Sequence, residues 1–150
     1  MEYCGCGDLA QKVERYKRRK SYIEEDVIWR YLIQALKALE YIHERNICHR
    51  DIKTANSFLA EDGSVKMGDM NVSKKLKRGQ LQTQIGTPYY MSPEIWNNRP
   101  YDATSDIWSL GCMIYEVSYN ACYVYVVYII CYEQLYIVIF ASIYLQFYTL

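Results

Sequence analysis

The stretch His49-Arg50-Asp51-Ile52-Lys53-Thr54-Ala55-Asn56 decides how the rest of the chain is interpreted. Transfer of a phosphoryl group to a hydroxyl requires an acceptor for the hydroxyl proton, a cation near the phosphate and oxygen ligands for magnesium. Asp51, Lys53 and Asn56 can supply all three from one loop. His-Arg-Asp alone is also compatible with a surface ion pair, but the whole octet, with Lys at its fifth position and Asn at its eighth, is specific.

An amphipathic segment precedes this octet, over residues 24–45. Its apolar side chains recur every three or four residues, which predicts one helix with a single apolar stripe; they are Ile28, Leu32, Ala35, Leu36, Leu39 and Ile42. Ser21 followed by Glu24 has the spacing of a capping box at the start of this helix. Asn46 readily ends a helix. We therefore expect the octet in a loop that directly follows a helix.

Short apolar runs follow the octet. Phe58-Leu59 and Val65-Lys66-Met67 flank Glu61-Asp62-Gly63-Ser64. Asp-Gly between two such runs predicts a β-hairpin.

Beyond the hairpin, residues 74–85 are polar and lack periodicity, which predicts a loop. Pro88, Pro93 and Pro100 exclude a long helix in the next stretch. Residues 104–117 then predict a buried helix, because they are apolar almost all round. The expected fold class is mainly α with a short β-hairpin.

Three further motifs follow the octet in order. They are residues 69–71 (DMN), 86–94 (GTPYYMSPE) and 106–111 (DIWSLG). With the octet they stand where a protein kinase has its catalytic loop, its D-F-G segment, its substrate-facing loop ending in A-P-E, and the helix that anchors the catalytic loop. The chain thus resembles the protein Ser/Thr kinases. Within these it is similar to the NIMA-related (NEK) group, because residues 1–9 (MEYCGCGDL) resemble the hinge of that group.

The resemblance implies that residues 1–117 form the C-terminal lobe of a protein kinase. It also implies roles for single residues. Asp51 would orient the substrate hydroxyl and accept its proton, and Lys53 would contact the transferring phosphate. Asn56 and Asp69 would hold magnesium.

The resemblance further implies a nucleotide site. Glu2 and Cys4 would offer backbone groups to the adenine of ATP. Phe58 or Leu59 would lie below the adenine ring.

Regulation is implied as well. Arg50 would pair with a phosphate on the activation segment, and Thr83 is the candidate, because added charge opposite an arginine can order a loop. A solvated loop hydroxyl is an equally good interpretation of Thr83. Thr87 would face the catalytic loop, and His49 would pack beside the magnesium segment.

The chain departs from a whole kinase domain in two respects. The resemblance places Met1 at the hinge, so the Gly-rich loop, the strand Lys and the helix Glu fall outside this sequence. We therefore expect the chain alone to bind ATP weakly and to transfer phosphate barely. Met70 and Asn71 replace the Phe and Gly of D-F-G. Methionine keeps an apolar side chain and asparagine tolerates a positive φ, so we expect the segment to keep its shape.

Composition narrows the function further. The chain has 17 Lys and Arg against 17 Asp and Glu, and this zero net charge disfavours a nucleic-acid partner. The dense basic run of residues 12–20 is interpreted as a solvated loop between two helices. Six cysteines follow no secretory signal, which indicates free thiols and a cytoplasmic location. Cys4 and Cys6 are closer in sequence than the usual zinc ligands.

Residues 118–150 form a second segment, an apolar tail rich in tyrosine. From Tyr119 onward the only charged residue is Glu133. A membrane-spanning helix is one interpretation, since about 20 apolar residues suffice to cross a bilayer. Buried strands are another, given the β-branched and aromatic content. A third is that read-through or a frame shift has replaced the ending typical of the family.

The function expected from these features is ATP-dependent phosphorylation of protein Ser or Thr with magnesium. Two alternatives stay open. The chain could be a non-catalytic binding module with a kinase-like surface, or a fragment tethered to a membrane through its tail.

Overall fold

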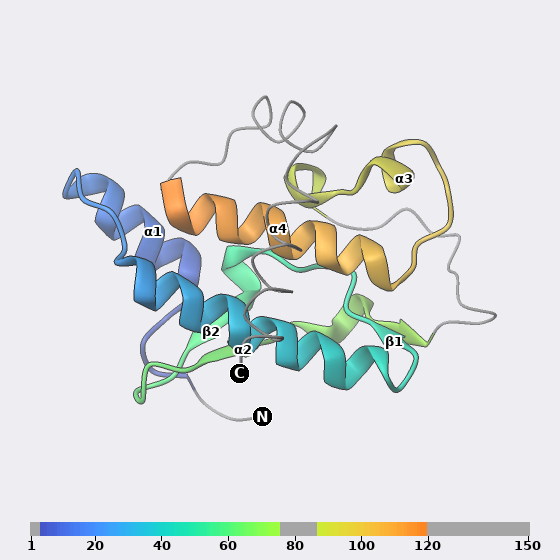
Figure 1. Ribbon diagram of the computed structural model, residues 1–150, viewed down its shortest axis with the longest axis horizontal. Helices are drawn as coiled ribbons and strands as arrows, with labels where there is room; N and C mark the ends of the chain where they lie inside the picture. The colour runs from blue at the N-terminus through green and yellow to red at the C-terminus, as the bar shows by residue number, and fades with distance from the viewer. Residues whose placement is uncertain (1–3, 76–86, 120–150) are drawn as a thin grey trace, which may run out of the picture.

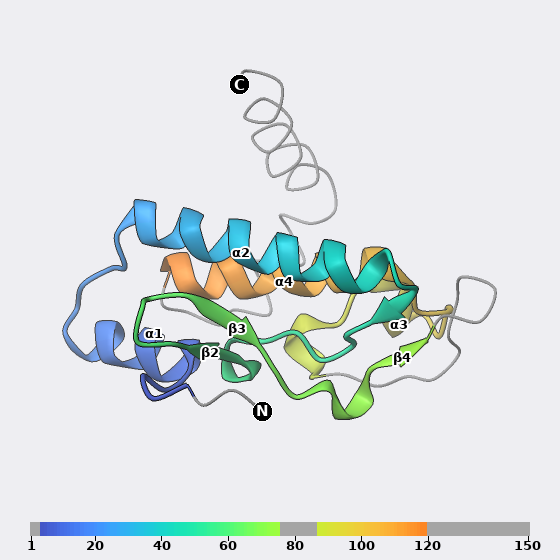
Figure 2. The same cartoon turned by 90° about the horizontal axis from the view of Figure 1, so that it is seen from below.

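The structure is a computed structural model that describes residues 4–75 and 87–119. Two long helices, α2 (Glu25–His43) and α4 (Ala103–Tyr119), form its centre. Figures 1 and 2 show them packed side by side and antiparallel, with α1 (Leu9–Arg18) at one end. The remaining helix, α3 (Pro93–Trp96), is a single turn.

One apolar core joins these helices. Its buried side chains come from one face of each helix: Leu9 and Val13 of α1, Tyr31, Leu32, Ala35 and Leu39 of α2, and Leu110, Met113 and Val117 of α4. Fully burying a side chain of the size of leucine stabilises a fold by roughly 1.5–3 kcal/mol. The stripe predicted for residues 24–45 is thus the face that α2 turns to the core.

Helix α1 corrects the prediction of a loop at residues 12–20. Asp8 is the N-cap of this helix, and its Oδ1 accepts a hydrogen bond of 2.8 Å from the Gln11 N–H. Leu9 and Val13 are spaced four apart and buried, so they hold one face of the helix on the core. Only two buried apolar residues form this face, and the many Lys and Arg around them favoured a solvated loop in the sequence prediction.

The C-terminal end of α2 agrees with the sequence prediction, and the N-terminal end does not. Asn46 has φ 57 and ends the helical stretch, and its N–H donates to the His43 carbonyl at 2.8 Å, as its residue type predicts. The predicted capping box is wrong. Glu24 is the N-cap, and its side chain makes no capping hydrogen bond.

The predicted hairpin is confirmed as strands β2 (Ser57–Leu59) and β3 (Val65–Met67), paired antiparallel with Phe58 opposite Lys66. Gly63 has φ 78 in the turn, a conformation that only glycine adopts without strain. From α2, the Gln34 side-chain oxygen accepts a hydrogen bond of 2.6 Å from the Val65 N–H, which ties the hairpin to the core.

A second small sheet was not predicted. Strand β1 (Ile47–Cys48) pairs antiparallel with β4 (Lys74–Lys75), at the start of the stretch expected to be a loop. Both β4 residues are exposed lysines, so the strand carries no apolar pattern.

The proline-rich stretch from Pro88 to Pro100 forms no long helix, as predicted, and contains two short turns instead. Pro88–Tyr90 is a 3₁₀ turn, and α3 starts with Pro93 in its first position, where proline loses no helical hydrogen bond. The predicted helix at 104–117 is confirmed as α4. No helix within the described ranges is both long enough and apolar enough to span a bilayer. The tail was predicted to begin at residue 118, but α4 continues through Ser118 and Tyr119. The interpretations of the rest of the tail fall on residues 120–150, outside those ranges.

Candidate active site

The carboxylate of Asp51 is the centre of the candidate site. Its Oδ2 accepts hydrogen bonds from Lys53 Nζ at 2.7 Å and from Asn56 Nδ2 at 2.8 Å. Its Oδ1 accepts one from Thr87 Oγ1 at 3.0 Å, and Lys53 Nζ also donates to that hydroxyl at 2.9 Å. Three residues of the octet and one from the predicted substrate-facing loop therefore meet at one carboxylate.

These contacts set the charge of Asp51. Burial acts to raise the pKa of this carboxyl, but hydrogen bonds from Lys53 and Thr87, with the charge of Lys53 and a bond from Asn56, outweigh it. The pKa is lowered as a result, so Asp51 is a carboxylate at neutral pH. A carboxylate there can accept a hydrogen bond from a substrate hydroxyl.

Asp106, near the start of α4, holds the backbone of the octet in place. It is fully buried, and its Oδ2 and Oδ1 accept hydrogen bonds of 2.9 Å from the backbone N–H groups of His49 and Arg50. Arg50 has φ 75, a strained conformation for a residue other than glycine. The two backbone bonds to Asp106 hold that turn just before Asp51.

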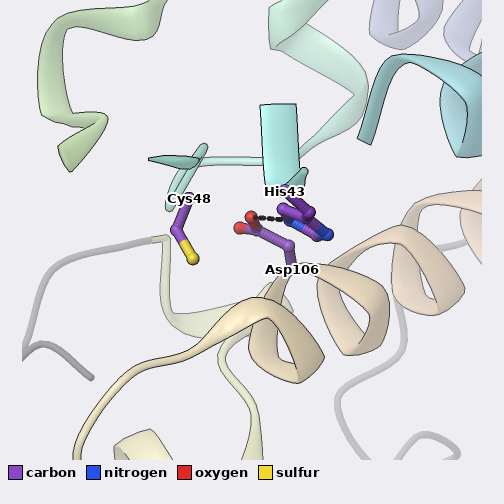
Figure 3. Close-up of side chains that lie close together, drawn as sticks. All are labelled: His43, Cys48 and Asp106. Carbon is purple, nitrogen blue, oxygen red and sulfur yellow. Dashed lines mark hydrogen bonds and ion pairs between the residues drawn. The ribbon is translucent and has the colours of Figure 1, made fainter. Parts of the chain in front are cut away.

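Two more side chains support Asp106, and sequence reasoning missed both. Tyr101 donates to Oδ1 at 2.6 Å, and His43 Nε2 lies 2.8 Å from Oδ2 (Figure 3). Burial acts to raise the pKa of Asp106, but the hydrogen bonds from His43, Tyr101 and the backbone lower it. His43 ends α2, so the long helix, the octet and α4 are joined at one carboxylate. No local pattern marks such long-range partners.

Cys48 lies beside His43 and Asp106, and these three residue types can all bind a metal ion. Ligand atoms of His43, Cys48 and Asp106 all lie within 4.8 Å of one another (Figure 3). Burial, and then the charge of Asp106, raises the pKa of the Cys48 thiol to about 12, so it stays protonated. Both oxygens of Asp106 already accept hydrogen bonds. The arrangement therefore fits a structural anchor better than a metal centre.

The predicted magnesium ligands lie on neighbouring segments. The Gly68 N–H donates to the Asn56 carbonyl at 2.9 Å, which brings Asp69, the next residue, beside the octet. Asp69 is exposed and has φ 57. A positive φ was expected at Asn71, but that residue lies in a 3₁₀ turn (Met70–Val72) without one. Met70 is 42% exposed, so within the described residues it is not buried as D-F-G packing would require.

The nucleotide-site residues are placed in part. The predicted hinge runs alongside β2, where the Leu59 N–H donates to the Gly7 carbonyl at 2.8 Å and the Cys6 N–H donates to the Leu59 carbonyl at 3.2 Å. Leu59 is buried, whereas Phe58 and Cys4 are partly exposed. Glu2 lies outside the described residues.

Of the predicted regulatory pair, Arg50 and Thr83, the structure describes only Arg50. Arg50 is 3% exposed, and its guanidinium carbon lies 5.6 Å from the centre of the Tyr101 ring. Thr83, its predicted phosphorylated partner, lies outside the described residues.

A further contact network was not anticipated. Glu116 of α4 accepts hydrogen bonds from Tyr90 Oη and from Thr54 Oγ1, the latter at 3.0 Å. Thr54 belongs to the octet and Tyr90 to the proline-rich stretch, so α4 ties these two segments together a second time.

Comparison with known proteins agrees with this arrangement. The family model described as "Protein kinase domain" matches residues 1–128. The chain is 46% identical over 122 residues to the probable serine/threonine-protein kinase nek2 of Dictyostelium discoideum, covering 79% of this chain and 29% of that protein. It is 48% identical over 120 residues to the mouse serine/threonine-protein kinase Nek5, covering 78% of this chain and 19% of Nek5. It is 45% identical over 119 residues to the mouse serine/threonine-protein kinase Nek3, covering 78% of this chain and 23% of Nek3.

The chain thus spans less than a third of the length of these curated relatives. The match nevertheless covers most of the chain and includes both the octet and α4. This chain belongs to the protein kinase domain family, among its NEK serine/threonine kinases.

Proposed function

We propose that residues 1–117 form the C-terminal lobe of an ATP-dependent protein Ser/Thr kinase and carry its phosphoryl-transfer residues. Residues 118–150 then form a separate tail. The observation that carries this proposal is the convergence of Lys53, Asn56 and Thr87 on the carboxylate of Asp51.

In this reaction the hydroxyl oxygen of a substrate Ser or Thr attacks the γ-phosphorus of ATP. The new O–P bond forms while the bond from the γ-phosphorus to the β–γ bridging oxygen breaks, and ADP leaves. Asp51 orients the hydroxyl and accepts its proton. Its lowered pKa makes it a weak base, which suits a transition state in which positioning matters more than proton removal. Lys53, held by Asp51 and Thr87, places its charge beside the transferring phosphoryl group.

The residues present fit a magnesium ion. Both hydrogen bonds from Asn56 to Asp51 use the amide nitrogen and not the oxygen. Asp69, whose carboxylate is exposed, directly follows Gly68, the residue that donates to the Asn56 carbonyl. Oxygen ligands of this kind are those that Mg²⁺ prefers, and Asn56 and Asp69 would hold it. When bound, the ion would neutralise charge on the phosphate oxygens of ATP.

The test measures phosphate transfer in two preparations. The first is the 150-residue chain with Mg-ATP and a generic Ser/Thr peptide, which we expect to show little transfer. The second is a chimera in which residues 4–119 replace the matching segment of mouse Nek5. We expect the chimera to be active and its Asp51→Asn variant to lose activity by about a hundredfold or more. A correctly folded chimera without activity would overturn the proposal.

A non-catalytic binding module remains the second candidate, because of one contact. Asn71, at the position where D-F-G has glycine, donates its Nδ2 to Asp69 Oδ1 at 2.5 Å. This bond competes with metal for the same carboxylate. If the chimera folds and binds Mg-ADP without transferring phosphate, this second function is supported.

A further inference from the structure

An open groove lies away from Asp51, between α1 and the turn that joins β2 to β3. Its cavity volume is about 920 Å³, within the range of ligand sites. Figures 1 and 2 both place α1 and this turn at the same end of the molecule. The groove is lined by Lys12, Arg15 and Arg19 along α1 and its C-cap, by Tyr31 of α2 and by Glu61 of the turn.

The α1 side of this groove is strongly basic. Lys12, Arg15, Arg18 and Arg19 all line it, against the acidic Glu14 and Glu61. Arg18 and Glu14 pair with each other, with Nε and Oε1 2.8 Å apart. Within residues 4–75 and 87–119, Arg15 and Arg19 form no ion pair. A helical face with uncompensated positive charge therefore borders an open groove.

Lys12, which lines the groove, is held in place by Tyr31. Its Nζ donates to Tyr31 Oη at 2.6 Å and lies 5.0 Å from the centre of the Tyr31 ring. Tyr31 is buried, so core packing restricts its side chain to one position. A cation fixed on a rigid aromatic ring loses little conformational entropy when an anion binds to it.

We propose that this groove, called here the α1 groove, binds an acidic segment of a partner protein. Charge complementarity favours Asp- or Glu-rich sequence, with its carboxylates against Arg15 and Arg19. This chain does not itself supply such a segment in its other residues. Residues 76–86 contain no acid, residues 1–3 contain one, and residues 120–150 contain only Glu133.

A peptide suits the α1 groove better than a nucleic acid. Glu61 faces α1 from the turn, and Glu14 lies on α1 itself. A polyphosphate carries its charge in the backbone itself and would bring it against these carboxylates. In an extended peptide successive side chains point to opposite sides, so even polyglutamate can turn half of its carboxylates away from Glu14 and Glu61. The groove shares Leu59 with the predicted nucleotide site but none of Asp51, Lys53, Asn56 and Thr87. The proposal concerns the basic α1 wall and does not rest on phosphoryl transfer.

The test measures binding to the full 150-residue chain by fluorescence anisotropy. The probes are a labelled polyglutamate peptide, a polylysine peptide of equal length and a single-stranded oligonucleotide. The variants are Arg15→Glu and Lys17→Glu, which change the net charge equally. Both residues are exposed on α1, but they lie two positions apart, on opposite faces of the helix, and only Arg15 lines the groove.

We expect polyglutamate to bind and polylysine not to bind. Arg15→Glu should weaken polyglutamate binding about fivefold or more, while Lys17→Glu should change it by less than about twofold. Glu61→Lys, on the opposite wall, should tighten binding. Loss of the native groove is not expected to tighten binding, so this third variant complements Arg15→Glu. Its gain supports the groove only when Lys17→Glu leaves binding unchanged, because all three variants alter the net charge.

Three results would overturn the proposal. One is absence of polyglutamate binding. Another is equal weakening by Arg15→Glu and Lys17→Glu, which would mean a diffuse response to net charge. The third is tighter binding of the oligonucleotide than of the peptide.

Discussion

Thr87 donates a hydrogen bond to Asp51, with Oγ1 and Oδ1 3.0 Å apart, although the two residues lie 36 positions apart in the sequence. Lys53 Nζ donates to both partners, at 2.9 Å to the hydroxyl and at 2.7 Å to the carboxylate. The three side chains form a closed triangle. The predicted substrate-facing loop is therefore held, through Thr87, by the same carboxylate that is proposed to orient the substrate.

Replacing Thr87 with valine should slow phosphate transfer in the chimera. Valine keeps the shape of the side chain but removes the hydroxyl, so Asp51 loses one hydrogen bond and Lys53 loses an acceptor. A hydrogen bond to a charged group contributes about 1.5–3 kcal/mol, so we expect kcat to fall by about tenfold or more. Thr87→Ser retains the hydroxyl and should stay close to the parent. Equal rates for the serine and valine variants would contradict this role.

Asp106→Asn should strongly destabilise the fold. The carboxylate is fully buried and accepts hydrogen bonds from two backbone N–H groups, Tyr101 and His43. In asparagine an NH₂ group replaces one carboxylate oxygen, so a donor would face the donors that now bond to that oxygen. We expect the free energy of unfolding, measured by urea titration, to fall by about 3 kcal/mol.

The matched control for Asp106 is Asp62→Asn. Asp62 is an exposed turn residue whose Oδ1 accepts one local hydrogen bond, from the Ser64 N–H. Its replacement should change the free energy of unfolding by no more than about 0.5 kcal/mol. Similar losses from the two variants would mean that Asp106 is not an anchor.

Much of the helical frame was predictable because its signals are local. The apolar stripe of α2 repeats at helical spacing, Asn46 carries the positive φ that its residue type tolerates, and Gly63 does so in the hairpin turn. Helix α1 was not predicted, although Asp8 is a typical N-cap residue and Leu9 begins the apolar face. The reason is that charged residues outnumber apolar ones in this stretch. Strand β4 could not be found, since exposed lysines bear no strand pattern.

The candidate site was predictable in its chemistry and not in its support. Asp51, Lys53 and Asn56 lie within one octet, so their meeting follows from short spacing. The partners of Asp106 come from other elements, and nothing in the sequence joins His43 or Tyr101 to it. Such contacts depend on how α2 packs against α4, which only the folded structure establishes.

The fold should lose stability on mild acidification through His49. This side chain is 1% exposed, and burial lowers its pKa below 6.5, against the opposing charges of Asp106, Asp51 and Asp69. The unfolded chain binds a proton near pH 6.5, while the folded chain resists it. Stability from this residue is therefore complete above pH 6.5 and is lost as the pH falls below that value. The free energy of unfolding should decrease between pH 6.5 and about pH 5.

His49→Phe is the variant that isolates this effect. It removes the titrating ring and keeps an aromatic side chain in the same buried position. The free energy of unfolding of the parent and of the variant, measured by urea titration across this pH range, should converge as the pH falls. Parallel curves would show that His49 titrates alike in the folded and unfolded states.

Asn71→Gly should improve magnesium binding. The Asn71 amide donates to Asp69 Oδ1 at 2.5 Å and so occupies a carboxylate oxygen that is proposed to hold the ion. Removing the amide frees that oxygen, and the magnesium concentration needed for half-maximal Mg-ADP binding to the chimera, measured by calorimetry, should fall several-fold. Asn71→Ala is the comparison, because it also removes the amide but adds no backbone freedom, and Asn71 needs no positive φ. If both variants bind magnesium more tightly, the amide is the cause. If only glycine does, the gain comes from loop flexibility and not from release of the carboxylate. If neither does, Asp69 is not limited by Asn71, and the contact is structural.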